Sequence, residues 1–199
     1  MAKRLPESQR GFSLVEILVT LVIVMIGLLG LAGVQMRAMQ AELESYQRAQ
    51  ALVLVADMVE RINANRKAPQ CYAVTTDPAN GTPYVGAGNT AAATCTAWGT
   101  AALQAIAVAD LTAWDNLLKG SAETLGGASV GAMIGARGCV TRDAATETYR
   151  VAVAWQGIAP TIAPDDPALD PAATCGKNLY GDEKLRREVS TRVRIANLK

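Results

Sequence analysis

An apolar run over residues 17–34 constrains the fold of this chain more than any other part of the sequence. Its only members that are not strongly apolar are Thr20, Ala32 and the glycines Gly27, Gly30 and Gly33. A run of about 18 such residues is long enough to cross a bilayer as a helix, and a helix satisfies its own backbone hydrogen bonds in lipid. The sequence therefore predicts one membrane-spanning helix over residues 12–34.

Basic residues precede this run and orient it. Lys3, Arg4 and Arg10 outweigh Glu7, and basic flanks stay on the cytoplasmic side of a membrane. We therefore expect the remainder of the chain to be exported. A secretory signal peptide shares the basic start and the apolar core, but it is cut after that core at a small-residue site, so a cleavage site before the core would leave the apolar helix in the mature chain.

The string Gly-Phe-Ser-Leu-Val-Glu at 11–16 joins the basic leader to the apolar run. In this position it resembles the signature of type IV prepilins. The resemblance implies a leader peptide of residues 1–11, cleavage by prepilin peptidase between Gly11 and Phe12, and N-methylation of Phe12. It also implies that the N-terminal amine of a neighbouring subunit neutralises Glu16 during assembly. The alternative is that Glu16 lies hydrated at headgroup depth, because an unpaired carboxylate inside the membrane is costly.

The three glycines of the run lack the spacing of a nucleotide-binding loop and of the common small-residue dimer face. Each lowers helix propensity by about 1 kcal/mol relative to alanine. Pilins often have a stretch of this helix that loosens inside the filament. Local melting there, close helix packing and no special role all stay open for Gly27, Gly30 and Gly33.

The helix is expected to continue over residues 35–68, because no glycine or proline occurs from 35 to 66. A helix from Phe12 to about Arg66 is too long to be buried in a small domain, so we expect its second half to pack on a globular head. The apolar positions of this half recur at helical spacing, and this stripe is predicted to contact the head. Its members are Met36, Met39, Leu43, Tyr46, Leu52, Val55, Val59 and Ile62.

Residues 69–199 are predicted to form an α+β head. Residues 71–131 are rich in turn signals, with a helix over about 101–118 whose interruption near Asp110 stays open. Strands are predicted over 149–155 and 188–195, because both segments alternate apolar and polar residues. A third strand is predicted over 137–142, joined to the strand at 149–155 by a hairpin at 143–147. An antiparallel sheet packed on the distal half of the long helix is the expected architecture.

Four cysteines, Cys71, Cys95, Cys139 and Cys175, follow the membrane segment. An even number in an exported domain indicates two disulfides. Of the three possible pairings, proximity in sequence favours Cys71–Cys95 and Cys139–Cys175. The chain has no histidine and no CxxC spacing, which argues against a zinc or redox site and against a histidine base. We expect no enzyme activity, no metal and no cofactor.

Charged residues give no case for a nucleic-acid partner, because 19 basic side chains nearly balance 18 acidic ones. A loop rich in aspartate and proline over 160–171 could bind calcium, but its spacing favours a solvated loop. A basic cluster near the end has Asp182, Glu183 and Glu188 interspersed, and is predicted to be the solvated face of a strand with local ion pairs. Docking of a partner is the alternative, and the members are Arg186, Arg187, Arg192 and Arg194.

Further blocks narrow the resemblance to the PilV-type minor pilins of type IV pilus systems. They are Arg-Gly-Cys-Val at 137–140, Tyr-Arg-Val-Ala-Val-Ala-Trp-Gln-Gly at 149–157, Cys-Gly at 175–176 and Arg-Arg-Glu-Val-Ser at 186–190. The resemblance implies an inner-membrane subunit with a periplasmic head, incorporated into the pilus with a major pilin and other minor pilins. It also implies roles in priming assembly, in twitching motility and adhesion, and in displaying a tip adhesin.

Two alternatives stay open. A minor pseudopilin of a type II secretion system shares the leader, Glu16 and the long helix. A single-pass membrane protein with a periplasmic binding head that never polymerises would share the helix but not the processing after Gly11.

Overall fold

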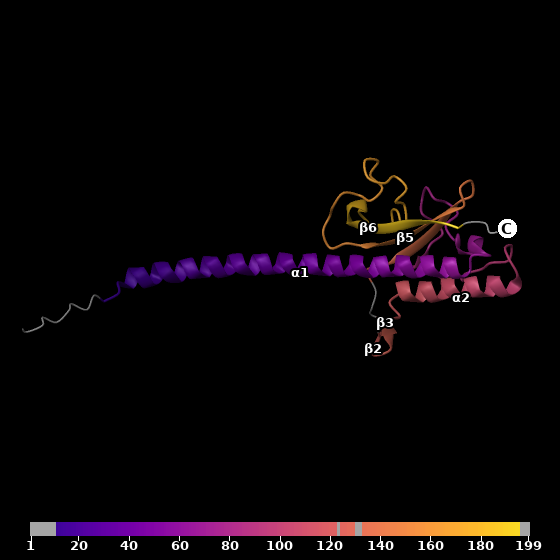
Figure 1. Ribbon diagram of the computed structural model, residues 1–199. Helices are drawn as coiled ribbons and strands as arrows, with labels where there is room; N and C mark the ends of the chain where they lie inside the picture. Colours follow the sequence, from indigo (N-terminus) through magenta and orange to yellow (C-terminus); the bar gives the residue numbers. More distant parts are fainter. Residues whose placement is uncertain (1–10, 123, 130–132, 196–199) are drawn as a thin grey trace, which may run out of the picture. The chain divides into compact units, whose positions relative to one another are not determined.

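The computed structural model describes residues 11–122, 124–129 and 133–195. The chain divides into two compact units, Met1–Leu43 and Glu44–Lys199. One helix, α1 (Leu14–Ala64), contributes residues to both units (Figure 1). It begins two residues after the predicted start at Phe12 and ends two residues before Arg66 and four before the end of the predicted segment 35–68. The predicted leader lies outside the described residues except for Gly11, and the predicted boundaries of the leader, membrane and head segments stay predictions.

In the first unit, α1 exposes all of its side chains from Leu14 to Leu43. The helix is long and apolar enough to cross a membrane, judged by length and composition. Gly27, Gly30 and Gly33 have no atom of another segment near the position of an added Cβ. The three interpretations of these glycines therefore stay open.

In the second unit, residues 44–64 of α1 bury one face. The buried side chains are Ala51, Val55, Met58 and Ile62, which recur at the spacing of a helix face. The prediction of a contact is wrong for Met36, Met39, Leu43 and Tyr46, which are 53–66% exposed, and for Leu52, which is 50% exposed. Consecutive helical residues are about 100° apart, so the position next to Ala51 turns away from the buried face.

The sheet of the second unit has the strand order β1-β4-β5-β6, and each neighbouring pair is antiparallel. Its strands are β1 (Val85–Gly86), β4 (Arg137–Asp143), β5 (Thr148–Gln156) and β6 (Arg186–Arg194). The predicted hairpin joins β4 to β5, with Arg142 opposite Tyr149. This sheet and the long apolar helix confirm the predicted α+β class.

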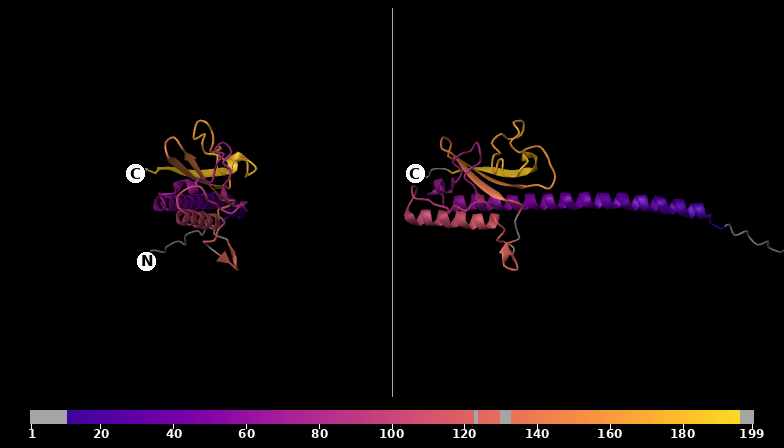
Figure 2. Two further views of the ribbon diagram at one scale, coloured as in Figure 1. Left: turned by 90° about the vertical axis from the view of Figure 1, so that its right-hand side faces the viewer. Right: turned by 180° about the vertical axis from the view of Figure 1, so that it is seen from behind.

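A second helix, α2 (Ala101–Leu118), runs beside the distal part of α1 on the same side of the sheet (Figures 1 and 2). The side chain of Thr100 caps its N-terminus by accepting a hydrogen bond from the Leu103 amide. The helix continues through Asp110 without interruption, because that carboxylate accepts hydrogen bonds from Arg61 and Tyr72 instead of competing for the backbone.

Trp114 of α2 joins both helices to the sheet. Its Nε1–H donates to the Leu54 carbonyl of α1 at 3.0 Å. Its ring lies against Gly138 of β4, where an added Cβ would come within 2.3 Å of the indole. This close approach explains the glycine in the Arg-Gly-Cys-Val block. The Trp114 side chain belongs to the main core together with Met58, Leu111 and Val151.

Smaller elements occupy the segments between these. The 3₁₀ helix η1 (Pro69–Tyr72) follows α1, and η2 (Glu183–Leu185) precedes β6. In the region predicted to be rich in loops, β2 (Thr124–Leu125) pairs with β3 (Ala128–Ser129) in an antiparallel hairpin separate from the main sheet (Figure 1).

The opposite face of the sheet is covered by residues 157–185. A second core forms there from Cys139, Ala152, Ala154, Cys175 and Tyr180. The prediction of a half-buried β5 is therefore wrong in part. Tyr149, Val151, Val153 and Trp155 face the helices as expected, but the alanines between them are buried as well, because a disulfide-linked loop covers them.

Candidate processing site and buried charge cluster

The predicted cleavage site lies immediately before the first turn of α1. Gly11, Phe12 and Ser13 are non-helical, and the Ser13 carbonyl accepts hydrogen bonds from the Glu16 amide at 3.0 Å and the Ile17 amide at 3.3 Å. Phe12 is 81% exposed. The Gly11–Phe12 peptide bond is therefore non-helical and exposed.

Glu16 lies in the first turn of α1 and is exposed. The helix N-terminus carries a partial positive charge that favours a carboxylate there. In this first turn the side chain is close in sequence to the amine that cleavage would create at Phe12. Cleavage at Gly11, methylation of Phe12 and charge pairing of Glu16 stay predictions.

Two disulfides form the covalent framework of the second unit. Cys71 is joined to Cys95 and Cys139 to Cys175, the two pairs that sequence proximity favours. The first links η1 to the loop before α2. The second links β4 to residues 157–185 and so holds this segment over the sheet.

Arg186 corrects the prediction of a solvated basic face. Its side chain is fully buried, and its guanidinium contacts three carboxylates, those of Asp165 at 2.8 Å, Glu183 at 2.6 Å and Glu188 at 3.2 Å. It also donates to the Ala173 carbonyl at 2.6 Å. We call Arg186, Asp165, Glu183, Glu188 and Arg150 the buried charge cluster.

Glu188 lies at the centre of this cluster with only 2% of its side chain exposed. It accepts from Arg150 at 3.1 Å and from the Cys175 amide at 3.0 Å. Burial raises the pKa of Glu188 to about 7, while the guanidinium groups of Arg150 and Arg186 act in the opposite direction. A buried charge of this kind needs its partners in place, so the cluster requires the loop over 157–185 to be closed on the sheet.

The aspartate–proline loop is solvated as predicted, since no residue from 160 to 171 is buried, but two of its carboxylates pair with cations of the chain. Asp165 pairs with Lys177 at 2.9 Å as well as with Arg186, and Asp170 pairs with Arg150 at 2.8 Å. These carboxylates are therefore occupied by cations of the chain itself. Within residues 11–122, 124–129 and 133–195, no group of three or more metal-ligating side chains comes together.

Sequence reasoning predicted local ion pairs of Arg186 but missed its burial and its pairing with Asp165, although one signal was available. Arg186 and Glu188 share one face of β6, and Val189 lies on the other, which packs on the main core. Both charged residues therefore lie on the face that a disulfide-linked, carboxylate-rich loop must cross. The remaining arginines behave as predicted in part. Arg192 and Arg194 are exposed, whereas Arg187 pairs with Glu44 of α1 at 3.2 Å.

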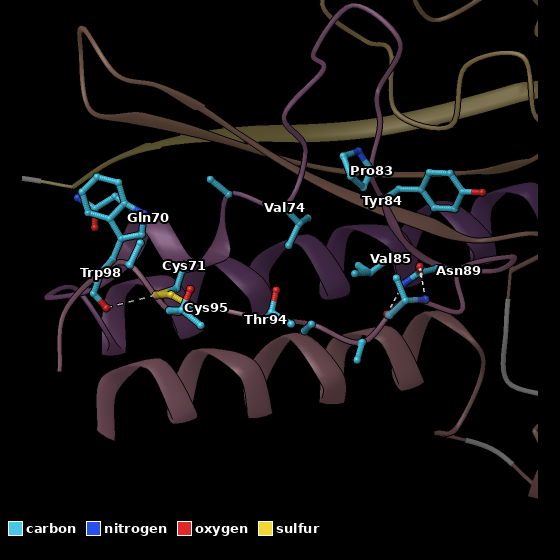
Figure 3. A pocket seen from close by; sticks show the side chains of 16 residues that line it. Gln70, Cys71, Val74, Pro83, Tyr84, Val85, Asn89, Thr94, Cys95 and Trp98 are labelled. Atoms are coloured by element: carbon cyan, nitrogen blue, oxygen red, sulfur yellow. Dashed lines mark hydrogen bonds between the residues drawn. A yellow bond between two sulfur atoms is a disulfide. The ribbon is translucent and has the colours of Figure 1, made fainter. Parts of the chain in front are cut away.

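A surface pocket of about 370 Å³ lies beside the Cys71–Cys95 disulfide. Figure 3 shows Trp98 at one end of it and Tyr84 with Val85 at the other. Its lining contains no charged side chain, so it offers no carboxylate or lysine as a general base.

Comparison with known proteins adds two adjoining matches. Residues 8–32 match the family model of the prokaryotic N-terminal methylation motif. Residues 33–107 match the family model of the type IV pilin Tt1218. No curated protein and no solved structure matched the chain.

Together, the apolar helix, the α+β head and these matches support a type IV pilin with a prepilin-type N-terminus. Pilins of this kind are structural subunits and not a class of enzyme. The methylation motif implies processing by prepilin peptidase and, with the apolar helix, suggests membrane anchoring.

Proposed function

We propose that this chain is a minor pilin of the PilV type, which joins other minor pilins to prime assembly of a type IV pilus. It is cut after Gly11 and N-methylated at Phe12, and its head lies in the periplasm until the subunit enters the filament beside the major pilin. The observation that carries the proposal is the methylation motif at 8–32, immediately ahead of a pilin-family match at 33–107.

The PilV-type assignment draws its support from the head. The resembling blocks at 137–140, 149–157 and 186–190 fall on β4, β5 and β6, which are adjacent strands. They include Gly138 under Trp114 and Arg186 in the buried charge cluster. The resemblance therefore follows the residues that build this sheet and its covered face, and does not rest on exposed loops.

Glu16 is the assembly residue in this proposal. Entry into the filament transfers its carboxylate into an apolar environment, where a lone charge is unfavourable and a partner charge offsets much of the cost. The methylated amine of Phe12 in a neighbouring subunit supplies that partner. Pairing of the two charges then favours one axial stagger between subunits.

The experiment that tests the proposal deletes the gene and compares three readouts: surface pili, twitching motility and secretion of exported enzymes. Loss of pili and twitching with normal secretion is expected. Loss of secretion with normal pili would instead assign the chain to the minor pseudopilins of type II secretion. No change in any readout, in a strain with no second copy, would favour a membrane protein that never polymerises.

Complementation sharpens this result. Wild-type chain should restore pili and appear in sheared filaments at a small fraction of the major pilin, as quantified by mass spectrometry. Glu16→Ala should be cleaved normally and yet be depleted from sheared pili, because its charge partner is lost. Undiminished recovery of Glu16→Ala in the filaments would contradict the pairing mechanism.

A further inference from the structure

The outer edge of β6 is a strand edge without a partner. β6 is the last strand in the order β1-β4-β5-β6, and among the described residues nothing pairs with its far side over residues 190–194. Ser190, Thr191, Arg192 and Arg194 are all exposed along this stretch. Unpaired N–H and C=O groups on such an edge can accept an added strand.

The register identifies which backbone groups point outward. The Ile195 amide donates to the Glu147 carbonyl, and the Gly157 amide donates to the Leu185 carbonyl. Because hydrogen-bonded and non-bonded pairs alternate in an antiparallel ladder, the odd-numbered residues of β6 bond to β5. The even-numbered residues Ser190, Arg192 and Arg194 therefore direct both their N–H and C=O groups away from the sheet.

The outer edge of β6 is covered at its start, near Arg187, and is not covered by any described segment over residues 190–194. At the near end, Arg187 bonds to the Ala159 carbonyl and to Glu44, and the Thr161 amide donates to the Lys184 carbonyl. These contacts place residues 157–161 against the start of β6. No described segment covers residues 190–194 in the same way.

Charge selects the kind of strand that fits. Arg192 and Arg194 make no ion pair within the described residues. The acidic side chains that share their shallow grooves are engaged elsewhere, Asp170 with Arg150 and Asp143 with Thr146. Two copies of this chain paired through β6 would bring like charges together, which is unfavourable.

We propose that the edge of β6 at residues 190–194 binds an extended, acidic segment of another protein by antiparallel strand addition. In this arrangement residues directly opposite Arg192 and Arg194 share their face of the sheet and exchange both backbone hydrogen bonds with them. The matching segment therefore carries carboxylates at two positions separated by one residue, and the amides of these acidic residues point toward β6.

This geometry gives a probe that separates strand addition from charge attraction. The probe is a fluorescent peptide with the core sequence Thr-Val-Glu-Thr-Glu-Val-Thr, whose last threonine lies opposite Ser190, and it is titrated with the full chain in detergent micelles. N-methylation of the two glutamate amides removes the hydrogen bonds to β6 and should weaken binding about tenfold or more. N-methylation of the intervening threonine and the final valine leaves charge and composition the same and should change binding little.

Variants of the chain test the same edge. Arg192→Glu with Arg194→Glu should abolish binding of the glutamate peptide and create binding of its lysine analogue. The matched control, Arg48→Glu with Arg66→Glu, reverses two other exposed arginines of the second unit and should leave binding unchanged. Ser190→Pro should weaken binding with both arginines retained, because it removes an outward N–H and no bond to β5.

Amide hydrogen exchange supplies a readout that does not depend on variants. The peptide should slow exchange at Ser190, Arg192 and Arg194, whose amides point outward, more than at Thr191 and Val193, which already bond to β5. Equal loss from both N-methylated peptides, binding without protection of these amides, or no binding of the glutamate peptide would overturn the proposal. Pairing of two chains through β6 would overturn it as well.

Discussion

The two units of this chain place their apolar residues in opposite environments. From Leu14 to Leu43 every side chain of α1 is exposed, including Ile26 at 65% and Leu29 at 75%. In the second unit Trp114, Val151 and Val153 are fully buried. Exposed apolar surface on this scale requires a covering partner, whereas the head already supplies its own.

The difference shows that the two units depend on different forces. The apolar part of α1 keeps its backbone satisfied by helical hydrogen bonds alone, so that a bilayer or neighbouring helices can surround it. The head depends on side-chain packing, two disulfides and a buried charge cluster. Changes in the first unit should therefore alter processing and assembly, and changes in the second should alter stability.

The largest expected effect lies in the first unit. Gly11→Val adds a branched side chain at the predicted cleavage position, where the peptidase must approach the backbone closely. We expect an uncut precursor that stays in the membrane, measured as a larger band on immunoblots and as an unmethylated N-terminus by mass spectrometry. The head should keep its normal denaturation curve. A mature band of normal size from this variant would contradict processing at Gly11.

The next effect lies in the buried charge cluster. Arg186→Met keeps the approximate side-chain volume but leaves Asp165, Glu183 and Glu188 without their shared cation. Breaking a buried charge arrangement in this way destabilises a protein by about 3–5 kcal/mol. Tryptophan fluorescence of the full chain during denaturation measures this change in the head alone, because all three tryptophans lie between residues 98 and 155.

Arg194→Met is the matched control for Arg186→Met. It removes the same charge from the same strand at an exposed position, where substitutions change stability by about 0.5 kcal/mol or less. Equal denaturation midpoints for the two variants would show that the buried cluster contributes nothing particular to stability.

Local periodicity was sufficient to predict the longest elements. The presence of α1, β5 and β6 follows from helical or alternating spacing over many residues, whereas the two-residue strands β1, β2 and β3 were not predicted. The sequence predicted the presence of a helix more accurately than it predicted which of its residues face the head. Leu52 was predicted to contact the head, yet the smaller Ala51 is buried in its place, since a difference of one residue in phase is hard to resolve in a mostly apolar helix.

The buried charge cluster could not be predicted in the same way. In the sequence, Arg186 has the same alternation as Arg192 and Arg194, which are exposed. Its burial depends on Asp165, which is 21 residues away and lies in a loop with no periodic pattern. Contacts of this kind are set by the path of the loop between Cys139 and Cys175, and local propensity carries no information about that path.

A smaller loss of stability is expected from filling the close contact in the core. Gly138→Ala places a methyl group within 2.3–2.7 Å of the Trp114 ring and Leu118, so that α2 must shift from β4. Overpacking of this severity should lower the free energy of unfolding by about 3 kcal/mol. The control is Gly126→Ala, in the β2–β3 turn, where no atom lies near the added methyl group.

Gly126 also has a positive φ of 59°, which gives the control a cost of its own of roughly 1 kcal/mol. The two variants are therefore compared by the tryptophan emission spectrum of the folded protein as well as by the denaturation midpoint. Gly138→Ala should shift the tryptophan emission spectrum of the folded protein and Gly126→Ala should not. An unshifted spectrum with unchanged stability for Gly138→Ala would contradict the contact between α2 and β4.

The smallest effect depends on pH. Burial disfavours the charged form of Asp165, but its hydrogen bond with Lys177 and the charge of Arg186 outweigh burial, so its pKa is lowered from 3.8. A carboxyl whose pKa is lower in the folded state stabilises the fold above its unfolded pKa and loses this contribution as the pH falls through the folded value. Asp165→Asn should therefore lower the free energy of unfolding by about 1–2 kcal/mol at neutral pH.

As the pH falls below 3.8 and through the lower folded-state pKa of Asp165, the stabilities of the parent and of Asp165→Asn should converge, because the parent carboxyl becomes protonated as well. Asp166→Asn is the matched control, since Asp166 accepts a hydrogen bond from the Ala168 amide that an asparagine oxygen can also accept. A constant difference between Asp165→Asn and the parent across this range would mean that packing of the amide, and not charge, is responsible. The charge of Asp165 would then contribute nothing to stability, and the positive charge of Arg186 would be balanced by Glu183 and Glu188 alone.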